Sequence, residues 1–294
     1  MTTPVFDLER FEQARARIAG SVHRTPLVAS RTLSGRVGRP VWLKCENLQK
    51  TGAFKVRGAL HRLLRLSDEE RARGVSTISA GNHAQAVAWA ATAAGIPSLV
   101  VMPEGASPTK VRAAREYGAE VVLHGTASEA FRHVRELSEE RGLRFVHPFD
   151  DEEVVAGHGS CALEILEDLP DVASIVVPVG GGGLSSAIAA ATACVRPGVA
   201  VWGVEPRGAD AMARSLEIGK AVHLDRVDTV ADGLAAPMAG ELNLELLRAH
   251  ARGVVRVDDD AILRAMRLIV ERTKLLVEPS AAAGLAAVAA SWVS

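Results

Sequence analysis

Short runs of β-branched residues recur along the chain and are separated by longer stretches with helical periodicity. Runs of this length and composition predict strands buried on both faces, as in a parallel sheet, and the stretches between them predict helices. The expected strands occupy residues 41–43, 75–79, 97–103, 119–125, 174–180, 199–206 and 253–257, and the expected helices residues 84–94, 109–117, 127–141, 161–168 and 261–274. This alternation predicts an α/β fold with mostly parallel sheets.

Composition narrows the classes of function. The 294 residues carry 34 Lys and Arg against 35 Asp and Glu, so bulk charge attracts neither nucleic acid nor a membrane surface. Aromatic residues make up only 4%, too few for a surface that stacks on bases. Cys45, Cys161 and Cys194 are far apart, which predicts neither a disulfide framework nor a zinc site. With no apolar run typical of a membrane helix or secretion signal, we expect a cytoplasmic protein that binds a small molecule.

A lysine stands out in residues 46–59, which read ENLQKTGAFKVRGA. Lys55 falls in the first turn of an expected helix, directly after a glycine turn. The positive end of the helix dipole and burial both disfavour an ammonium group there, and the neutral amine is the form that attacks a carbonyl. The alternative is a surface lysine with its head in solvent, for which Lys50 is the natural comparison.

A small-residue turn, SAGNHAQ from Ser79, joins an expected strand to a helix. Free N–H groups at such a helix start can hold a carboxylate, and Asn82 offers both a donor and an acceptor beside them. The alternative is that Ser79 and Asn82 are ordinary N-cap residues and His83 an ordinary polar helix residue.

Four consecutive glycines, Gly180, Gly181, Gly182 and Gly183, follow an expected strand and precede a helix. Their cost in backbone entropy suggests that a ligand approaches the backbone closely, and amides of such a loop can cradle a phosphate. A flexible linker is the alternative. Because the spacing does not match GxGxxG and no acid follows about 20 residues later, we expect a single phosphate group rather than a dinucleotide.

An imine-forming lysine, a phosphate loop and a carboxylate turn together point to pyridoxal phosphate and an amino-acid substrate. The chain resembles the fold-type II pyridoxal-phosphate enzymes of the threonine/serine dehydratase and serine racemase group over nearly its whole length. The segments that carry the resemblance are HRTPL from His23, residues 46–59, SAGNHAQ from Ser79, YGAEVVLHG from Tyr117, the glycine loop, ADGL from Ala231 and VEPSAAAG from Val277.

The resemblance implies roles for individual residues. Lys55 would bind the cofactor covalently, Phe54 would pack on its ring, and Asn82 would bond its 3-hydroxyl. The expected phosphate ligands are residues 180–183 with Leu184, and the expected substrate-carboxylate site consists of Ser79, Ala80, Gly81, Asn82 and His83. Glu278 would lie near the cofactor or the domain interface, its alternative being a carboxylate favoured by a helix start.

The resemblance also implies an architecture and an activity. A large cofactor domain would comprise residues 1–66 and 153–294, with a small domain, residues 67–152, inserted between them. The expected reaction is dehydration and deamination of L-threonine or L-serine to a 2-oxo acid and ammonia, by a homodimer or homotetramer. An alternative of another class is a noncatalytic phosphate or nucleotide binder on the same scaffold.

Departures from the family pattern bear on the substrate. Relatives that racemise serine have a second serine after Ser79, whereas this chain has Ala80, which cannot donate a proton; elimination is therefore favoured over racemisation. The family's AGQGT reads AGHGS here, and His158 is either a residue that alters substrate choice or a local hydrogen-bonding residue. Dehydratases for 3-hydroxyaspartate or phenylserine thus stay open as alternatives, as does a serine racemase.

A divalent-cation site found in relatives is matched only in part. Glu205 and Ala209 correspond to two of its positions, but the third, an acid, is Ala211. A hard cation binds more weakly when it loses a carboxylate. Magnesium at Glu205 and Ala209 is therefore an expectation of weak binding at most.

The end of the chain is the last departure. The resemblance implies that a strand and a Ser-Gly-Gly-Asn type turn, which bonds the cofactor's pyridine nitrogen, follow the expected buried Ala-rich helix at residues 281–290. The sequence instead closes with SWVS at residues 291–294. We expect that it omits such a tail.

Overall fold

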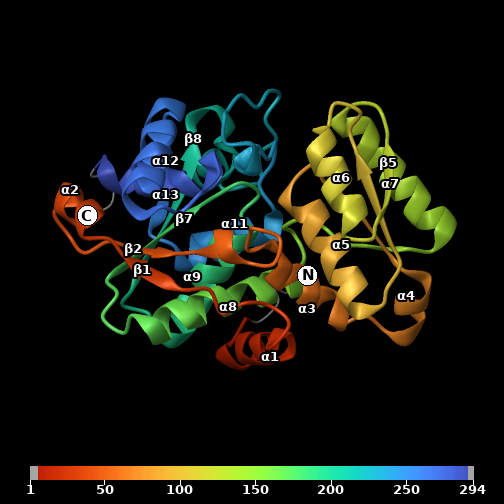
Figure 1. Ribbon diagram of the computed structural model, residues 1–294, viewed down its shortest axis with the longest axis horizontal. Coiled ribbons are helices and arrows are strands. Elements are labelled where there is room, and N and C mark those ends of the chain that lie inside the picture. Colours follow the sequence, from red (N-terminus) through yellow and green to blue (C-terminus); the bar gives the residue numbers. More distant parts are fainter. Residues whose placement is uncertain (1–5, 291–294) are drawn as a thin grey trace.

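The computed structural model describes residues 6–290, which form two lobes side by side (Figure 1). The elements of the first half are α1 (Leu8–Ile18), β1 (Leu27–Ala29), α2 (Arg31–Val37), β2 (Trp42–Lys44), the 3-10 turn η1 (Glu46–Leu48), α3 (Lys55–Leu64), α4 (Asp68–Arg73), β3 (Val75–Ile78), α5 (Asn82–Ala94), β4 (Ser98–Met102), α6 (Pro108–Glu116), β5 (Glu120–Leu123), α7 (Ala127–Arg141) and β6 (Arg144–Phe145). Those of the second half are α8 (Glu152–Asp168), β7 (Ser174–Pro178), α9 (Gly183–Val195), β8 (Ala200–Pro206), η2 (Arg207–Ala209), α10 (Ala211–Ile218), η3 (Asp232–Leu234), α11 (Glu241–His250), β9 (Gly253–Val257), α12 (Asp259–Thr273) and α13 (Pro279–Ala289).

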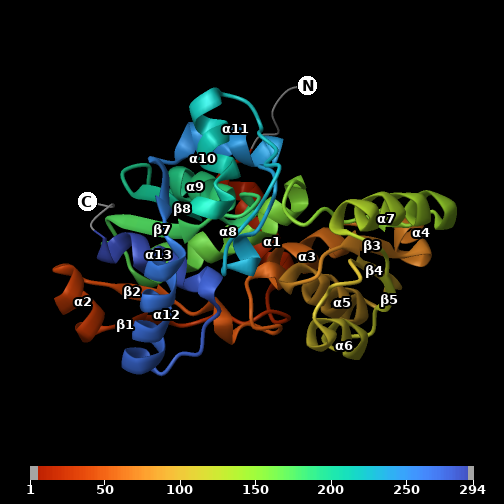
Figure 2. The same ribbon diagram turned by 90° about the horizontal axis from the view of Figure 1, so that it is seen from above.

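The smaller lobe is built on a parallel sheet in the order β5-β4-β3-β6. Successive residues of β4 face opposite sides: Val100 and Met102 pack with α5 and α6, whereas Leu99 and Val101 pack with α7. Every residue of β4 is buried, as expected for a central parallel strand covered on both faces. Figure 2 shows this lobe, with β3, β4 and β5 among α4 to α7, set apart from the rest.

The larger lobe contains a second parallel sheet, β7-β8-β9. Helices α8, α9 and α11 cover one face, and α12 and α13 cover the other. An antiparallel pair, β1 and β2, lies beside it. The layers match the predicted α/β fold, and the Ala-rich stretch forms the buried helix α13 as expected.

Helix α3 connects the two lobes. Val56, Leu60 and Leu63 share a core with residues of α5 and β3, while other positions of α3 pack against α8. Lys55, its first residue, therefore lies at the junction.

One helix extends further than predicted. The pattern indicates a helix from residue 161, but α8 begins at Glu152 and runs through Gly157 and Gly159. A Cβ at Gly157 would lie 2.5 Å from the carbonyl oxygen of Arg57, and one at Gly159 would lie 2.2 Å from the ring of Phe11. These glycines allow close helix packing, so they do not mark a break.

Within residues 6–290, no helix is both long and apolar enough to cross a membrane. The expectation about residues 291–294 falls outside the described part of the chain.

Candidate active site

Lys55 is the first residue of α3 and faces a cavity between the lobes. Its Nζ donates a hydrogen bond to the carbonyl oxygen of Pro148 at 2.7 Å. Burial lowers the pKa of the Lys55 amine to about 8, because desolvation disfavours the charged form. Lys50, by contrast, is exposed. The structure therefore bears out the expectation of a partly buried lysine with increased neutral character.

The cavity has a volume of about 1660 Å³ and draws its walls from both lobes. It brings together the residues predicted to bind cofactor and substrate, far apart in sequence: Phe54, Lys55, Ser79, Ala80, Gly81, Asn82, His83, Gly180, Gly181, Gly182, Gly183, Leu184 and Glu278. Glu205 and Ala209, the predicted metal positions, are not in its lining.

The glycine loop provides unpaired donors on one side of the cavity. None of the hydrogen bonds between described residues is donated by the backbone N–H groups of residues 180–185, although residues 181–183 are buried. The last of these N–H groups belong to the first turn of α9, where the helix dipole is positive. Such a concentration of free donors fits a phosphate group, as the pyridoxal-phosphate expectation requires.

Packing behind the loop explains why its residues are glycines. A Cβ at Gly181 would lie 2.4 Å from the ring of Phe149, and one at Gly182 would lie 2.7 Å from Cβ of Asn243. Gly182 also has φ of 100°, a left-handed conformation that favours glycine. Asn243 donates to the carbonyl oxygens of Phe149 and Gly181 at 3.0 and 3.1 Å, which fixes the loop.

The SAGNH turn provides donors on the opposite side. Ser79 Oγ accepts the Gly81 N–H at 3.0 Å, and Gly81 caps α5 with no side-chain hydrogen bond. No hydrogen bond between described residues uses the N–H groups of Ala80, Asn82 or His83. This helix start is suited to a carboxylate.

His83 is buried behind this turn. Its Nε2 lies 3.4 Å from the carbonyl oxygen of Val146, and burial lowers its pKa well below the ordinary value. Burial therefore favours the neutral form of the His83 ring.

Two polar contacts between residues that line the cavity run from lobe to lobe. The Asn82 amide donates to both carboxylate oxygens of Glu278, at 2.9 and 3.1 Å. Burial raises the pKa of Glu278, and the Asn82 hydrogen bonds partly oppose this. Lys110 of α6 forms an ion pair with Asp232 of η3. Glu278 also occupies the N-cap position of α13, where its side chain makes no hydrogen bond to the helix. The contact that the carboxylate makes is therefore the one between the lobes.

Glu205 makes contacts with a helix start. Its carboxylate is fully buried and accepts the N–H groups of Met212 and Ala213 at 2.9 and 2.8 Å, so it caps α10. The neighbouring Asp210 is held by Arg214 and Arg256. The described residues contain no group of three or more His, Cys, Asp or Glu placed to hold a metal ion. Magnesium binding stays a prediction.

Several site residues were not predicted from the sequence: Pro148, Phe149, Lys110, Asp232 and Asn243. Pro148 acts through a backbone carbonyl, which every residue type has. Asp232 lies within the ADGL segment that carried the resemblance, and that motif was the only available signal.

Comparisons with known proteins agree with this geometry. The family described as pyridoxal-phosphate dependent enzyme matches residues 18–292. An L-threonine ammonia-lyase of Geobacter sulfurreducens is 47% identical over 94% of this chain and 69% of its own. A phenylserine dehydratase of Ralstonia pickettii is 42% identical over 97% of this chain and 88% of its own.

Solved structures show the same fold. Maize serine racemase superposes with a TM-score of 0.94 at 40% identity, covering 96% of this chain and 86% of that one. This confirms the predicted fold-type II architecture. Together with the match over residues 18–292, it shows that the chain belongs to the family of pyridoxal-phosphate dependent enzymes.

Proposed function

We propose that this protein is an ammonia-lyase that removes the β-hydroxyl and the amino group of L-threonine or L-serine, giving a 2-oxo acid and ammonia. The observation that carries the proposal is the position of Lys55, whose pKa is lowered to about 8, in a cavity also lined by two helix starts with unpaired N–H groups. One helix start suits the cofactor phosphate and the other the substrate carboxylate.

In this proposal each residue has a defined task. Pyridoxal phosphate, when bound, supplies the electron sink that makes the substrate α-proton acidic. Residues 180–183 and Leu184 would hold its phosphate, Phe54 would pack against its ring, and Asn82 would bond its hydroxyl. Lys55 would be its covalent anchor and the base that takes the substrate α-proton. The SAGNH turn holds the substrate carboxylate and so orients the bond to be broken.

The two lobes enclose the cavity. We propose residues 67–152 as a small domain inserted into a large domain of residues 1–66 and 153–294. The contacts of Asn82 with Glu278 and of Lys110 with Asp232 join these parts at the cavity, which all four residues line. Closure excludes water from the site during reaction.

The relatives of this chain provide further candidates for the hydroxy amino acid substrate. The similarity to a phenylserine dehydratase and to an L-threo-3-hydroxyaspartate ammonia-lyase of Saccharomyces cerevisiae supports a larger or acidic substrate as the second candidate. Serine racemase is a third, but Ala80 lines the cavity where a proton donor is needed, and a methyl group supplies none. A chiral assay should therefore detect no rapid formation of D-serine.

A panel of four hydroxy amino acids tests the proposed substrate and reaction. Purified protein loaded with pyridoxal phosphate is given L-threonine, L-serine, 3-hydroxyaspartate and phenylserine, and 2-oxo acid and ammonia are measured together. L-Threonine or L-serine should give the highest kcat/KM. A higher value for either of the other substrates would replace the proposed substrate, and absence of ammonia from all four would overturn the proposed reaction.

A further inference from the structure

The helix that carries Lys55 has no side-chain cap. Phe54 occupies the N-cap position of α3 and makes no side-chain hydrogen bond to it. The Phe54 backbone carbonyl accepts the Arg57 N–H at 3.0 Å, rather than the Gly58 N–H that an α-helix would place there. The Gly58 N–H therefore takes its acceptor from a neighbouring element.

Helix α8 supplies an acceptor through His158. The Gly58 N–H donates to His158 Nδ1 at 3.1 Å, and the His158 side chain is fully buried. Since Nδ1 accepts, the ring is neutral with its proton on Nε2. Burial lowers the pKa of His158 well below its ordinary value, which preserves this acceptor.

The imidazole also fits tightly between the two helices. A Cβ at Gly58 would lie 2.5 Å from His158 Cε1, so glycine leaves the space that the ring fills. The ring meets Phe54 edge to face, with centroids 4.9 Å apart and planes at 71°. One side chain thus contacts the residue before Lys55 and the residue three positions after it.

Filling space does not account for a histidine at this position. Nε2 of His158 is buried and has no hydrogen-bond partner among the described residues. An unpaired buried N–H destabilises a protein, and an apolar side chain of similar size would avoid that cost. The acceptor at Nδ1 is the property that an apolar side chain lacks.

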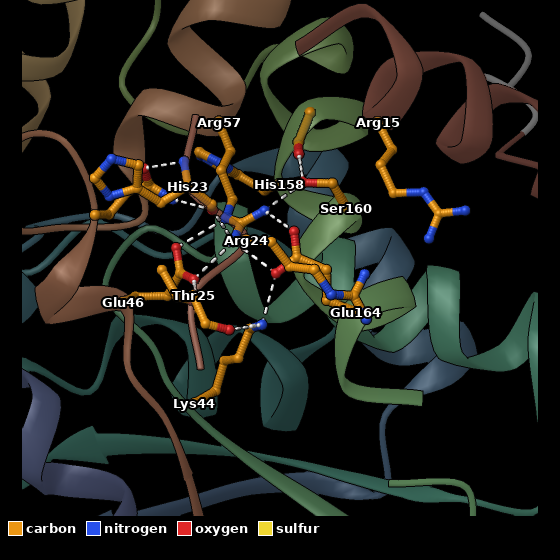
Figure 3. Close-up of polar contacts among 12 residues, drawn as sticks. Arg15, His23, Arg24, Thr25, Lys44, Glu46, Arg57, His158, Ser160 and Glu164 are labelled. Carbon is orange, nitrogen blue, oxygen red and sulfur yellow. Dashed lines mark hydrogen bonds and ion pairs between the residues drawn. The ribbon is translucent and has the colours of Figure 1, made fainter. Parts of the chain in front are cut away.

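The same turn of α3 is anchored to α8 a second time through Arg57 (Figure 3). The buried Arg57 guanidinium donates to both oxygens of Glu46 at 2.8 Å each, and to those of Glu164 at 2.7 and 2.9 Å. Lys44 donates to Glu164 at 2.6 Å, which balances the charge. This cluster limits sliding of α3 along α8, so His158 acts on a turn already held in register.

Titratable and charged groups face His158 from α3 and α5. Lys55, Arg57 and His61 lie on α3, and His83 lies on α5. All four disfavour a second proton on His158, in addition to burial. These groups therefore favour the neutral acceptor form of His158.

We propose that His158 is a positioning residue for Lys55: by accepting the Gly58 N–H and packing against Phe54, it fixes the first turn of α3 and the direction of the lysine amine. His158 lies behind Lys55, outside the lining of the cavity, and acts through the helix. The inference rests on the proposed function, in which Lys55 binds the cofactor covalently.

The test compares His158→Leu, which removes the acceptor, with His158→Gln, whose amide oxygen can accept. The matched control is His61→Gln, because His61 is a second buried histidine between α3 and α8, bonded to Glu153 at 2.8 Å. For each holoenzyme, kcat, KM and the pH midpoint of the visible absorbance band of the lysine-bound cofactor are measured.

We expect His158→Leu to lower kcat by about tenfold to a hundredfold with a smaller change in KM, since misplacement of a reacting group acts mainly on the chemical step. The pH midpoint of the visible band should rise by about half a unit or more. A displaced lysine nitrogen is reached by water, and water favours the charged form of that nitrogen. His158→Gln should keep kcat and the pH midpoint of the band close to their wild-type values. His61→Gln should lower Tm and leave both unchanged.

An unchanged midpoint and kcat in His158→Leu would overturn the inference, as would equal effects of His158→Leu and His61→Gln. If His158→Leu does not fold, His158→Met takes its place with the same expectations. A wild-type holoenzyme that has the band but releases no ammonia contradicts the proposed reaction alone, and the midpoint still tests His158. Absence of the band from wild type would overturn both.

Discussion

The Asn82 amide nitrogen lies 2.9 and 3.1 Å from the two carboxylate oxygens of Glu278. Asn82 begins α5 in the smaller lobe, and Glu278 occupies the N-cap position of α13 in the larger one. A single amide therefore links the SAGNH turn of the smaller lobe to the larger lobe, and both residues line the cavity.

This contact predicts the effect of replacing its amide donor by a carboxylate. Asn82→Asp places a carboxylate against Glu278, and we expect it to lower the free energy of unfolding by about 1–3 kcal/mol, the cost of an unmade hydrogen bond to a partly buried charged group. Adding Glu278→Gln restores a carboxylate–amide pair and should recover part of the loss. Urea unfolding of the single and double variants measures both effects. A double variant no more stable than Asn82→Asp would contradict the pairing.

The ion pair between Lys110 and Asp232 predicts a different response. Its side chains are substantially exposed, so Lys110→Met should change stability by less than about 1 kcal/mol. The variant should raise KM, because the pair joins the lobes at the cavity that both residues line. High salt should raise the wild-type KM in the same direction. Arg141→Met, which removes an exposed pair with Glu120 inside one lobe, is the control. Equal KM values for the two variants would refute the interlobe role.

The glycine loop predicts a contrast between two alanine substitutions. Gly181→Ala would bring a Cβ to 2.4 Å from the Phe149 ring, whereas a Cβ at Gly198 meets no atom within 4 Å. We expect Gly181→Ala to destabilise the protein by about 1–3 kcal/mol, as overpacking does, and to weaken retention of pyridoxal phosphate. Gly198→Ala should change neither. Thermal unfolding and dialysis of the loaded protein test this; retention at the wild-type level in Gly181→Ala would argue against a phosphate cradle here.

The lowered pKa of Lys55 predicts how cofactor loading depends on pH. Burial disfavours the ammonium form, so the amine loses its proton at a pH of about 8, below the ordinary value of 10.5. Only the neutral amine attacks the cofactor carbonyl. The rate at which cofactor-free protein gains visible absorbance on adding pyridoxal phosphate should therefore rise with pH and reach half its maximum near pH 8. A midpoint near 10 would show that the amine is solvated.

Much of the fold follows from local patterns. The β-branched runs predicted β3, β4, β7, β8 and β9, because strands buried on both faces are continuously apolar. The start of α8 was missed because Gly157 and Gly159 suggest a break when only local propensity is considered. Their reason lies in distant partners, the Arg57 backbone and the Phe11 ring, which local patterns do not identify.

The site, like the fold, contains residues that local patterns identify and residues that they do not. Lys55 and the glycine loop each lie in a continuous stretch of sequence with a recognisable pattern, and both were predicted as parts of the site. The partners that hold them are remote: Pro148 accepts from Lys55 across 93 positions, and His158 accepts from Gly58 across 100. Glu205 is another example of a remote contact, because its carboxylate accepts the N–H groups of Met212 and Ala213 in α10, which depends on where β8 ends relative to α10.

The most direct test of the account is replacement of Lys55 by alanine beside replacement of the exposed Lys50. Ammonia release from L-threonine and L-serine and the visible absorbance of the cofactor are measured for both purified variants, with circular dichroism to confirm folding. We predict that Lys55→Ala keeps its fold and loses both ammonia release and the visible band, and that Lys50→Ala keeps both. Ammonia release at an undiminished rate by a folded Lys55→Ala protein would contradict the account.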